Sequence, residues 1–246
     1  MKTRIYRNPT QINYDSIHDF FESRAQCYCE EKFLTTTMYQ DNNPDLAVER
    51  DRWEKATILP LLEIDYSSNV LDVGCGIGRW TQPALDSGAY YTGVDFSESL
   101  IRIAKNRFLG VDNCVFIQSA AQNISEKLRE RIFTHVIVSG VLIYMNDNEV
   151  KNTWEIISKL LVAGGLIYLR EPVSSIERLT LKEHWSDELN SCYSSIYRTE
   201  EELLKLFRES CLSVSNLRLI QSGFLYGDML NNRVETKQKY FIFRNT

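Results

Sequence analysis

Three glycines at every second position follow a short apolar stretch of the chain. Residues 70–80 read Val-Leu-Asp-Val-Gly-Cys-Gly-Ile-Gly-Arg-Trp, and Asp95 comes 23 residues after Asp72. The apolar residues predict a buried strand, and the glycines predict a turn without Cβ atoms, where the backbone can approach a ligand closely. An acidic side chain about 20 residues further on is placed to accept hydrogen bonds from both hydroxyls of a ribose. The pattern therefore indicates a cofactor that contains a nucleoside.

The usual phosphate-binding motifs are missing from the sequence. A dinucleotide fingerprint needs Gly-x-Gly-x-x-Gly, but Arg79 and Thr81 stand where the two possible frames require the third glycine. The sequence also lacks the Gly-Lys-Ser or Gly-Lys-Thr of a phosphate loop. We therefore expect a nucleoside without phosphates, and a nicotinamide oxidoreductase is the weaker alternative.

Residues 70–78 match, position by position, the form hydrophobic-hydrophobic-Asp/Glu-hydrophobic-Gly-x-Gly-x-Gly. The stretch thus resembles motif I of the class I S-adenosylmethionine-dependent methyltransferases, and residues 90–97, 114–122 and 135–142 resemble the next three strands of that family. The resemblance covers roughly residues 50–170. It implies S-adenosylmethionine as the cofactor and a Rossmann-like α/β fold. That fold is a seven-stranded, mostly parallel sheet with helices on both faces and a reversed C-terminal hairpin.

The resemblance also implies which residues bind the cofactor. Ala120 stands where the family commonly has Asp or Asn, so the adenine contact is expected from the backbone N–H of Ala121 and from Gln122. The fourth strand is expected to back the methionine part of the cofactor. The residues that the resemblance places around the cofactor are Asp72, Gly74, Cys75, Gly76, Asp95, Phe96, Ala120, Ala121, Gln122 and Ser139.

Composition and charge favour a single enzyme domain over residues 1–246. The chain carries 28 Lys plus Arg against 33 Asp plus Glu, a net charge of −5, without a basic run that could neutralise a phosphate backbone. Nucleic acid is therefore not expected as a partner. No stretch has the ~18 uninterrupted apolar residues of a membrane span, and the polar start leads into no signal core. We expect a cytoplasmic protein without a membrane partner, and the sequence leaves its oligomeric state open.

The six cysteines and three histidines do not form a metal-binding pattern. Cys27 and Cys29 are separated by one residue, whereas a zinc ribbon needs two to four. The histidines are far apart in the sequence, at His18, His135 and His184. In a chain of this length without an export signal, we expect the cysteines to stay reduced and to bind no metal.

Residues 1–45 lie outside the common core and have two interpretations. Ile17, Phe20 and Phe21 fall on one helical face, which is typical of ordinary packing onto a sheet. Alternatively, the segment is a helical lid over the cofactor, because aromatic faces attract a sulfonium cation when water is excluded. On this second interpretation we assign Tyr14 and Arg24 to the cofactor site.

Residues 171–198 form a second region outside the core, between the fifth strand and the next helix. The segment is too long for an ordinary loop, and its aromatic residues argue against disorder. We therefore expect an insert that caps the acceptor site. The side chains predicted to bind the acceptor are Tyr144, Tyr193, Tyr197 and Arg198. The arginine would matter most for an acceptor with a carboxylate or phosphate, which a guanidinium binds through two hydrogen bonds.

Methyl transfer is an in-line displacement in which the enzyme mainly aligns the reactants. An alcohol acceptor also needs its proton removed, which a nearby base can do for about 10² to 10⁴ in rate. His184 is one candidate, because the ordinary imidazole pKa of about 6.5 suits proton transfer. Glu171, at the carboxyl end of the fifth strand, is the other. Each residue also has a structural interpretation. On that interpretation His184 is a surface histidine, and Glu171 is the ion-pair partner of Arg170.

The preferred hypothesis is O-methylation of a sugar-type, secondary or surface-polysaccharide metabolite by an S-adenosylmethionine-dependent enzyme. A small-molecule N-methyltransferase is its nearest alternative, because an amine that enters unprotonated needs no dedicated base. Nucleobase methylation is disfavoured, since residues 139–142 read Ser-Gly-Val-Leu in place of an Asn/Asp-Pro-Pro-aromatic motif. A different class of function is a non-catalytic scaffold that keeps the fold and binds the cofactor.

Overall fold

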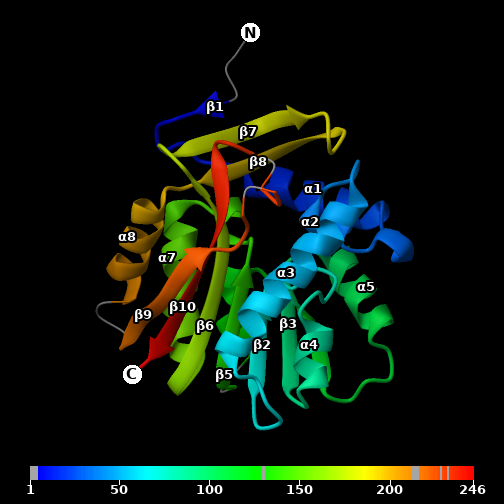
Figure 1. Ribbon diagram of the computed structural model, residues 1–246, viewed down its shortest axis with the longest axis vertical. Helices are drawn as coiled ribbons and strands as arrows, with labels where there is room; N and C mark the ends of the chain where they lie inside the picture. Colours follow the sequence, from blue (N-terminus) through cyan, green and yellow to red (C-terminus); the bar gives the residue numbers. More distant parts are fainter. Residues whose placement is uncertain (1–4, 129–130, 212–215, 228, 232) are drawn as a thin grey trace.

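A seven-stranded sheet runs through the middle of the molecule (Figure 1). The protein is seen in a computed structural model that describes residues 5–128, 131–211, 216–227, 229–231 and 233–246. The strands of this sheet are β2 (Asn69–Val73), β3 (Tyr90–Asp95), β4 (Cys114–Gln118), β5 (Phe133–Ser139), β6 (Leu161–Ser174), β9 (Leu217–Phe224) and β10 (Thr236–Asn245).

The strand order is β4-β3-β2-β5-β6-β10-β9. The first five strands pair in parallel, whereas β10 runs antiparallel to both of its neighbours. The predicted fold class, including the reversed C-terminal hairpin, is confirmed.

Both faces of this sheet are buried, as a parallel sheet requires. Successive strand residues point to opposite faces, so Leu71 and Val73 enter one apolar core while Val70 enters another. The first core is completed by α6 (Ile124–Leu128), α7 (Asp147–Leu160) and α8 (Glu200–Cys211). The second is completed by α3 (Pro44–Leu62), α4 (Thr81–Asp86) and α5 (Glu98–Arg107). The helices therefore form one layer on each side of the sheet.

A further layer lies over the carboxyl ends of the parallel strands, at the top of Figure 1. Its helices are α1 (Tyr14–Gln26) and α2 (Thr35–Met38), and its strands are β1 (Ile5–Tyr6), β7 (Leu179–Ser186) and β8 (Ser191–Tyr197). These strands form a small antiparallel sheet in which Ile5 lies opposite Leu181. The N-terminal segment and the segment after β6 are thus joined in one small sheet. Residues 1–4 of the N-terminal segment lie outside the described residues.

This upper layer has its own apolar core. The buried face of α1, with Ile17, Phe20 and Phe21, packs against Tyr193 and Tyr197 of β8. The helix begins at Asn13, whose side chain accepts a hydrogen bond from the backbone N–H of Asp15. The layer is therefore held to the molecule by packing as well as by strand pairing.

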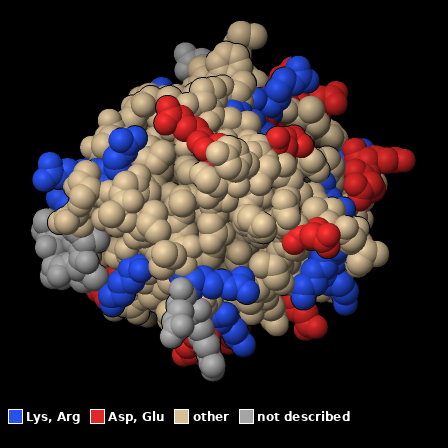
Figure 2. All heavy atoms as spheres, turned by 90° about the horizontal axis from the view of Figure 1, so that it is seen from below, with Lys and Arg blue, Asp and Glu red and all other residues tan. Residues whose placement is uncertain are grey.

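Charged side chains of both signs occur on the face opposite this layer. Figure 2 shows that face from below, with basic and acidic side chains mixed around the rim and other residues in the centre. Within the described residues, no helix is both long enough and apolar enough to cross a membrane.

Candidate functional site

The glycine turn after β2 has the conformation that only glycine adopts readily. Gly74 has φ +72° and Gly76 has φ +53°. A Cβ atom at Gly74 would lie 2.4 Å from a methyl carbon of Val141, and one at Gly76 would lie 2.7 Å from the methyl carbon of Thr37. The turn therefore packs its bare backbone against two neighbouring segments, and a larger residue does not fit there.

Asp95 ties the end of β3 to this turn. One carboxylate oxygen accepts a hydrogen bond from the backbone N–H of Gly76 at 2.9 Å, and the other accepts one from the N–H of Ser97 at 2.9 Å. Burial raises the pKa of Asp95 to about 6, although these two N–H groups act to lower it. Each oxygen keeps a second lone pair, so the carboxylate can still accept hydrogen bonds from a ligand.

A first cavity of about 710 Å³, part of it open to solvent, lies above the glycine turn. Most of the residues predicted for the cofactor line it: Tyr14, Gly74, Gly76, Asp95, Phe96, Ala120, Ala121, Gln122 and Ser139. Its wall also includes residues that the sequence analysis did not assign to the cofactor: Ile17, Phe21, Thr37, Tyr39, Leu100, Ser119, Gly140, Val141, Tyr144 and Met145. Ile17 and Phe21 also belong to the apolar core of the upper layer, so this helix face both packs within the protein and borders the cavity.

Three of the predicted cofactor residues do not line this cavity. Asp72 is buried and accepts a hydrogen bond from the hydroxyl of Tyr91 at 2.6 Å. Burial raises the pKa of Asp72 to about 7. Cys75 is buried in the core beneath the turn. Arg24 pairs with Asp41 instead of facing the ligand space. We interpret these three as residues that support the walls of the site.

A second cavity, of about 920 Å³, adjoins the first. The two share the side chains or backbone of Thr37, Tyr39, Ser139, Gly140 and Tyr144. Of the residues predicted to bind an acceptor, Tyr144, Tyr193 and Tyr197 line the second cavity, and Arg198 does not. A molecule in the second cavity would thus lie next to a molecule in the first.

Three arginines line the second cavity, and sequence analysis did not assign any of them to the site. Arg170 donates to the side-chain oxygen of Gln238 at 3.0 Å. Arg233 lies 3.4 Å from Glu188, which is the only acidic side chain among the described residues of this wall. Arg50 donates to the backbone carbonyl of Leu230 at 2.8 Å. The wall itself thus carries more arginines than carboxylates, while Arg170 is also paired, at 3.5 Å, with the buried carboxylate of Glu54 behind it.

These arginines come from elements that are distant in the sequence. Arg50 lies on α3, Arg170 on β6, and Arg233 in the segment before β10. No motif joins them, so spacing could not have identified the set. The one available signal was the place of Arg170 at the carboxyl end of a parallel strand, where α/β sheets bind ligands.

Glu171 holds the turn η3 (Leu142–Tyr144) rather than facing either cavity. Its carboxylate accepts hydrogen bonds from the backbone N–H groups of Val141 and Leu142, each at 2.8 Å, and of Ile143 at 3.3 Å. Burial raises the pKa of Glu171 to about 7, although these N–H groups act to lower it. Both oxygens thus bind the backbone of this turn, and the expected ion pair with Arg170 is not the main contact of Glu171.

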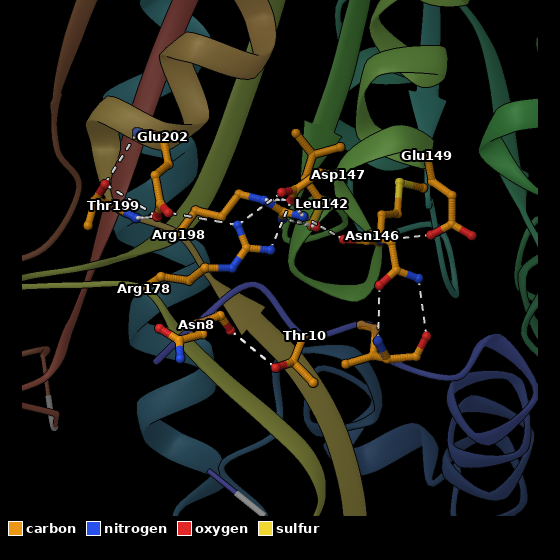
Figure 3. A network of polar contacts seen from close by, with 12 residues as sticks. Asn8, Thr10, Leu142, Asn146, Asp147, Glu149, Arg178, Arg198, Thr199 and Glu202 are labelled. Atoms are coloured by element: carbon orange, nitrogen blue, oxygen red, sulfur yellow. Dashed lines mark hydrogen bonds and ion pairs between the residues drawn. The ribbon is translucent and has the colours of Figure 1, made fainter. Parts of the chain in front are cut away.

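Arg198 also binds the backbone of this turn (Figure 3). It donates to the backbone carbonyls of Leu142 at 2.8 Å and Met145 at 2.6 Å, and its Nε lies 2.9 Å from a carboxylate oxygen of Asp147. Arg178 pairs with the same aspartate at 3.0 Å. Arg198 is therefore occupied by the protein and is not oriented toward an acceptor.

His184 lies on β7, with its ring centroid 6.4 Å from that of Tyr193. It lines neither of the two adjoining cavities. Among the described residues that do, Asp95 and Glu188 are the carboxylates and there is no histidine. The geometry thus brings neither predicted base to the junction of the cavities.

Comparison with known proteins gives one family match. Residues 70–165 match the family model described as a methyltransferase domain. Phosphoethanolamine N-methyltransferase 1 of Triticum aestivum is 27% identical over 154 residues, an alignment that covers 57% of this chain and 30% of that protein. Demethylmenaquinone methyltransferase of Staphylococcus epidermidis is 23% identical over 117 residues, covering 46% of this chain and 44% of that protein. The chain spans about a third of the length of the wheat protein.

Solved structures share the fold. Phosphoethanolamine N-methyltransferase 1 of Haemonchus contortus, in complex with phosphoethanolamine and S-adenosylhomocysteine, has a TM-score of 0.71 at 20% identity and covers 96% of this chain and 50% of its own. A S-adenosylmethionine-dependent methyltransferase of Leishmania major has a TM-score of 0.65 at 16% identity, covering 92% and 82%. The [4+2]-cyclase SpnF has a TM-score of 0.59 at 17% identity, covering 79% and 80%. The fold therefore occurs with more than one named activity.

Proposed function

We propose that this chain, which belongs to the class I S-adenosylmethionine-dependent methyltransferases, methylates the nitrogen of a small acceptor that also carries a phosphate or carboxylate. The observation that carries the proposal is the arginine-lined second cavity beside the first. Guanidinium groups recognise such anions with directed, charge-assisted hydrogen bonds.

The first cavity suits S-adenosylmethionine, which supplies a methyl group on a positively charged sulfur. Asp95 would accept hydrogen bonds from the ribose hydroxyls, and the backbone N–H of Ala121 with Gln122 would contact the adenine. The bare backbone at Gly76 supports this assignment, because it lines the cavity and an added Cβ would lie 2.7 Å from the methyl carbon of Thr37 in the same wall. We further propose that residues 1–45 act as a lid and residues 171–198 as an acceptor cap within a single domain.

The second cavity suits a molecule with charges at both ends. Arg170 and Arg233 would bind the anionic end, which leaves the amino end toward the wall that this cavity shares with the first. Phosphoethanolamine, which appears in the names of relatives in wheat and Haemonchus contortus, has this distribution of charge. We therefore choose it as the first acceptor to test.

A nitrogen acceptor is supported by the positions of the two predicted bases. His184 and Glu171 line neither of the two adjoining cavities, so the residues that favoured an alcohol acceptor lie away from the junction. An amine in its neutral form already has a free lone pair, and alignment is then the main requirement. O-Methylation of a sugar-type or related metabolite remains the alternative hypothesis.

The test is a transfer assay with S-adenosylmethionine labelled at the methyl group. Phosphoethanolamine, ethanolamine and an alcohol with a phosphate group, such as glycerol phosphate, would be compared as acceptors. We expect labelled product from phosphoethanolamine, with a much higher KM for ethanolamine because the anion is missing. If the alcohol is the only one of the three acceptors that gives labelled product, O-methylation replaces N-methylation as the proposed reaction. Binding of S-adenosylhomocysteine without transfer to any acceptor of a cell extract would favour the scaffold.

A further inference from the structure

Two tyrosine hydroxyls meet where the two cavities join. The hydroxyl of Tyr39 is hydrogen-bonded to that of Tyr144, and both residues line both cavities. Tyr39 follows α2 in the upper layer, whereas Tyr144 ends the turn η3 after β5. The contact therefore joins the upper layer to the central sheet at the point where a cofactor and an acceptor would face each other.

Two buried side chains, those of Glu171 and Arg198, bind the backbone around Tyr144. Glu171 accepts three backbone N–H groups of the segment that leads into it, and Arg198 donates to the carbonyls of Leu142 and Met145. Glu171 and Arg198 are each 2% exposed. Charge-assisted hydrogen bonds of this kind are strong and directional, so they hold the backbone on both sides of Tyr144, whose ring lies 5.0 Å from that of Phe21 between centroids.

Tyr39 is fixed from the other side by a strained backbone and a buried arginine. Tyr39 has φ +62° and Gln40 has φ +65°, a conformation that persists in non-glycine residues only where the surroundings enforce it. Arg24 lies with its guanidinium carbon 5.4 Å from the centre of the Tyr39 ring. It also donates to Asp41 at 2.8 Å and to the carbonyl of Thr36 at 3.3 Å. The two hydroxyls are thus brought together by separate features: hydrogen bonds to the backbone around Tyr144, and the strained backbone and Arg24 at Tyr39.

We propose that the paired hydroxyls of Tyr39 and Tyr144 bind the reacting nitrogen of the acceptor and direct its lone pair at the methyl group of the cofactor. This inference rests on the proposed function. A primary amine has two N–H groups, and the two hydroxyl oxygens can accept one each. The lone pair is then left pointing away from the tyrosines, toward the first cavity.

The chemical step balances without a base from the protein. The nitrogen lone pair forms the new N–C bond while the C–S bond breaks and its electrons stay on sulfur, and the extra proton on nitrogen leaves to water. Burial raises the pKa of Tyr39 to about 12, so the phenol stays neutral and serves as a hydrogen-bond partner. The pairing also predicts selectivity: a primary amine fills both oxygens, a secondary amine fills one, and a tertiary amine fills neither.

The test compares Tyr39→Phe, Tyr144→Phe and the double variant with Tyr66→Phe, a control at a side chain that is 78% exposed. We expect each single variant to lower kcat for phosphoethanolamine by about 10- to 100-fold. The double variant should be no slower than the slower single variant, because the hydroxyls act as a pair. Saturable binding of S-adenosylhomocysteine by each variant shows that the variant is folded. The control should match the wild type.

The preference among primary, secondary and tertiary amines gives a second readout. Wild-type protein should favour the primary amine, and both variants should lose part of that preference. If the wild type is active and both variants keep its kcat and its preference among amines, the role of the tyrosines is overturned. The proposed function would still stand. A wild type that binds S-adenosylhomocysteine but methylates no amine would overturn the proposed function and this inference with it. If either variant does not fold, Arg24→Lys tests the same pair, and an unaltered kcat there would count against it.

Discussion

The two adjoining cavities are built in different ways. Most of the wall of the first comes from one part of the chain, between Gly74 and Met145, and it includes bare backbone at the glycine turn and small side chains at residues 119–121 and 139–140, with α1 and α2 above. The second is formed by long charged and aromatic side chains from α3, β6, β8 and the segment before β10. One site is thus specified by local backbone conformation and the other by the way distant elements pack.

This difference decides what each site can tolerate. A site formed by backbone loses its ligand when a Cβ atom is added, because the turn at Gly76 has no room for that atom. A side-chain site loses one contact at a time, since each arginine is held by its own partner. We therefore expect abrupt loss of function in the first cavity and graded loss in the second.

The largest effect is expected from Gly76→Val. The new side chain would have to adopt φ +53° and would overlap Thr37, so the affinity for S-adenosylhomocysteine should fall by about 100-fold or more, or ~3 kcal/mol. Isothermal calorimetry measures this directly. The control is Gly164→Val, which has a similar left-handed φ of +80° but nothing within 4 Å of an added Cβ. Equal losses in the two variants would mean that backbone strain, not the site, is responsible.

The same contrast explains what could be predicted from the sequence. The fold and most of the first cavity follow from local patterns, because Gly74, Gly76 and Asp95 must occur at fixed spacings for the turn to form. Glu171 and Arg198 were predicted to act on the acceptor, yet they hold the turn that carries Tyr144. A polar residue near a sheet end has the same sequence signature in both roles. Only tertiary packing shows whether its hydrogen bonds go to the protein or to a ligand.

The arginines of the second cavity could not be identified in advance for the same reason. Arg50, Arg170 and Arg233 are brought together by the pairing of β6 with β10 and by the position of α3 over the sheet. Each by itself is an ordinary basic residue in a chain with net negative charge. Pairing of the antiparallel hairpin is a long-range feature that no short pattern encodes.

Arg170→Met should affect the acceptor and leave the cofactor unchanged. Removing the guanidinium should raise the KM for phosphoethanolamine by roughly 10- to 100-fold, or about 1.5–3 kcal/mol, because a hydrogen bond to a charged group is lost. The affinity for S-adenosylhomocysteine should stay within about twofold. Steady-state kinetics with Arg52→Met, an exposed position on α3, gives the control. A parallel loss of cofactor affinity would show that the two cavities do not behave as separate sites.

Asp95→Ala tests the carboxylate that we propose accepts hydrogen bonds from the ribose hydroxyls. Its affinity for S-adenosylhomocysteine should fall by about 1–3 kcal/mol, since the charge-assisted hydrogen bonds to the ribose are lost. The KM for the acceptor should be unaffected. Asp86→Ala, at an exposed carboxylate of α4, is the matched variant. An unchanged affinity would remove Asp95 from the site.

The smallest effect is a pH dependence that belongs to the first cavity alone. Burial raises the pKa of Asp95 to about 6, so the carboxylate is charged above this pH and becomes protonated as the pH falls through it. A protonated Asp95 is a weaker acceptor for the ribose hydroxyls, so cofactor affinity should be constant from pH 8 to 7. Below about pH 6 it should fall by up to tenfold per unit. Calorimetric titration with S-adenosylhomocysteine between pH 5 and 8 measures the profile.

Asp95→Asn identifies the group responsible for that profile. The amide keeps one hydrogen-bond acceptor and does not titrate, so this variant should bind more weakly at pH 8 and show little change down to pH 5. Asp72, whose pKa burial raises to about 7, titrates in the same range but does not line the cavity, and it is intact in the variant. If the pH dependence remains in Asp95→Asn, we would assign it to the titration of Asp72 instead. The conformation of the glycine turn would then depend on the charge of a carboxylate in the core.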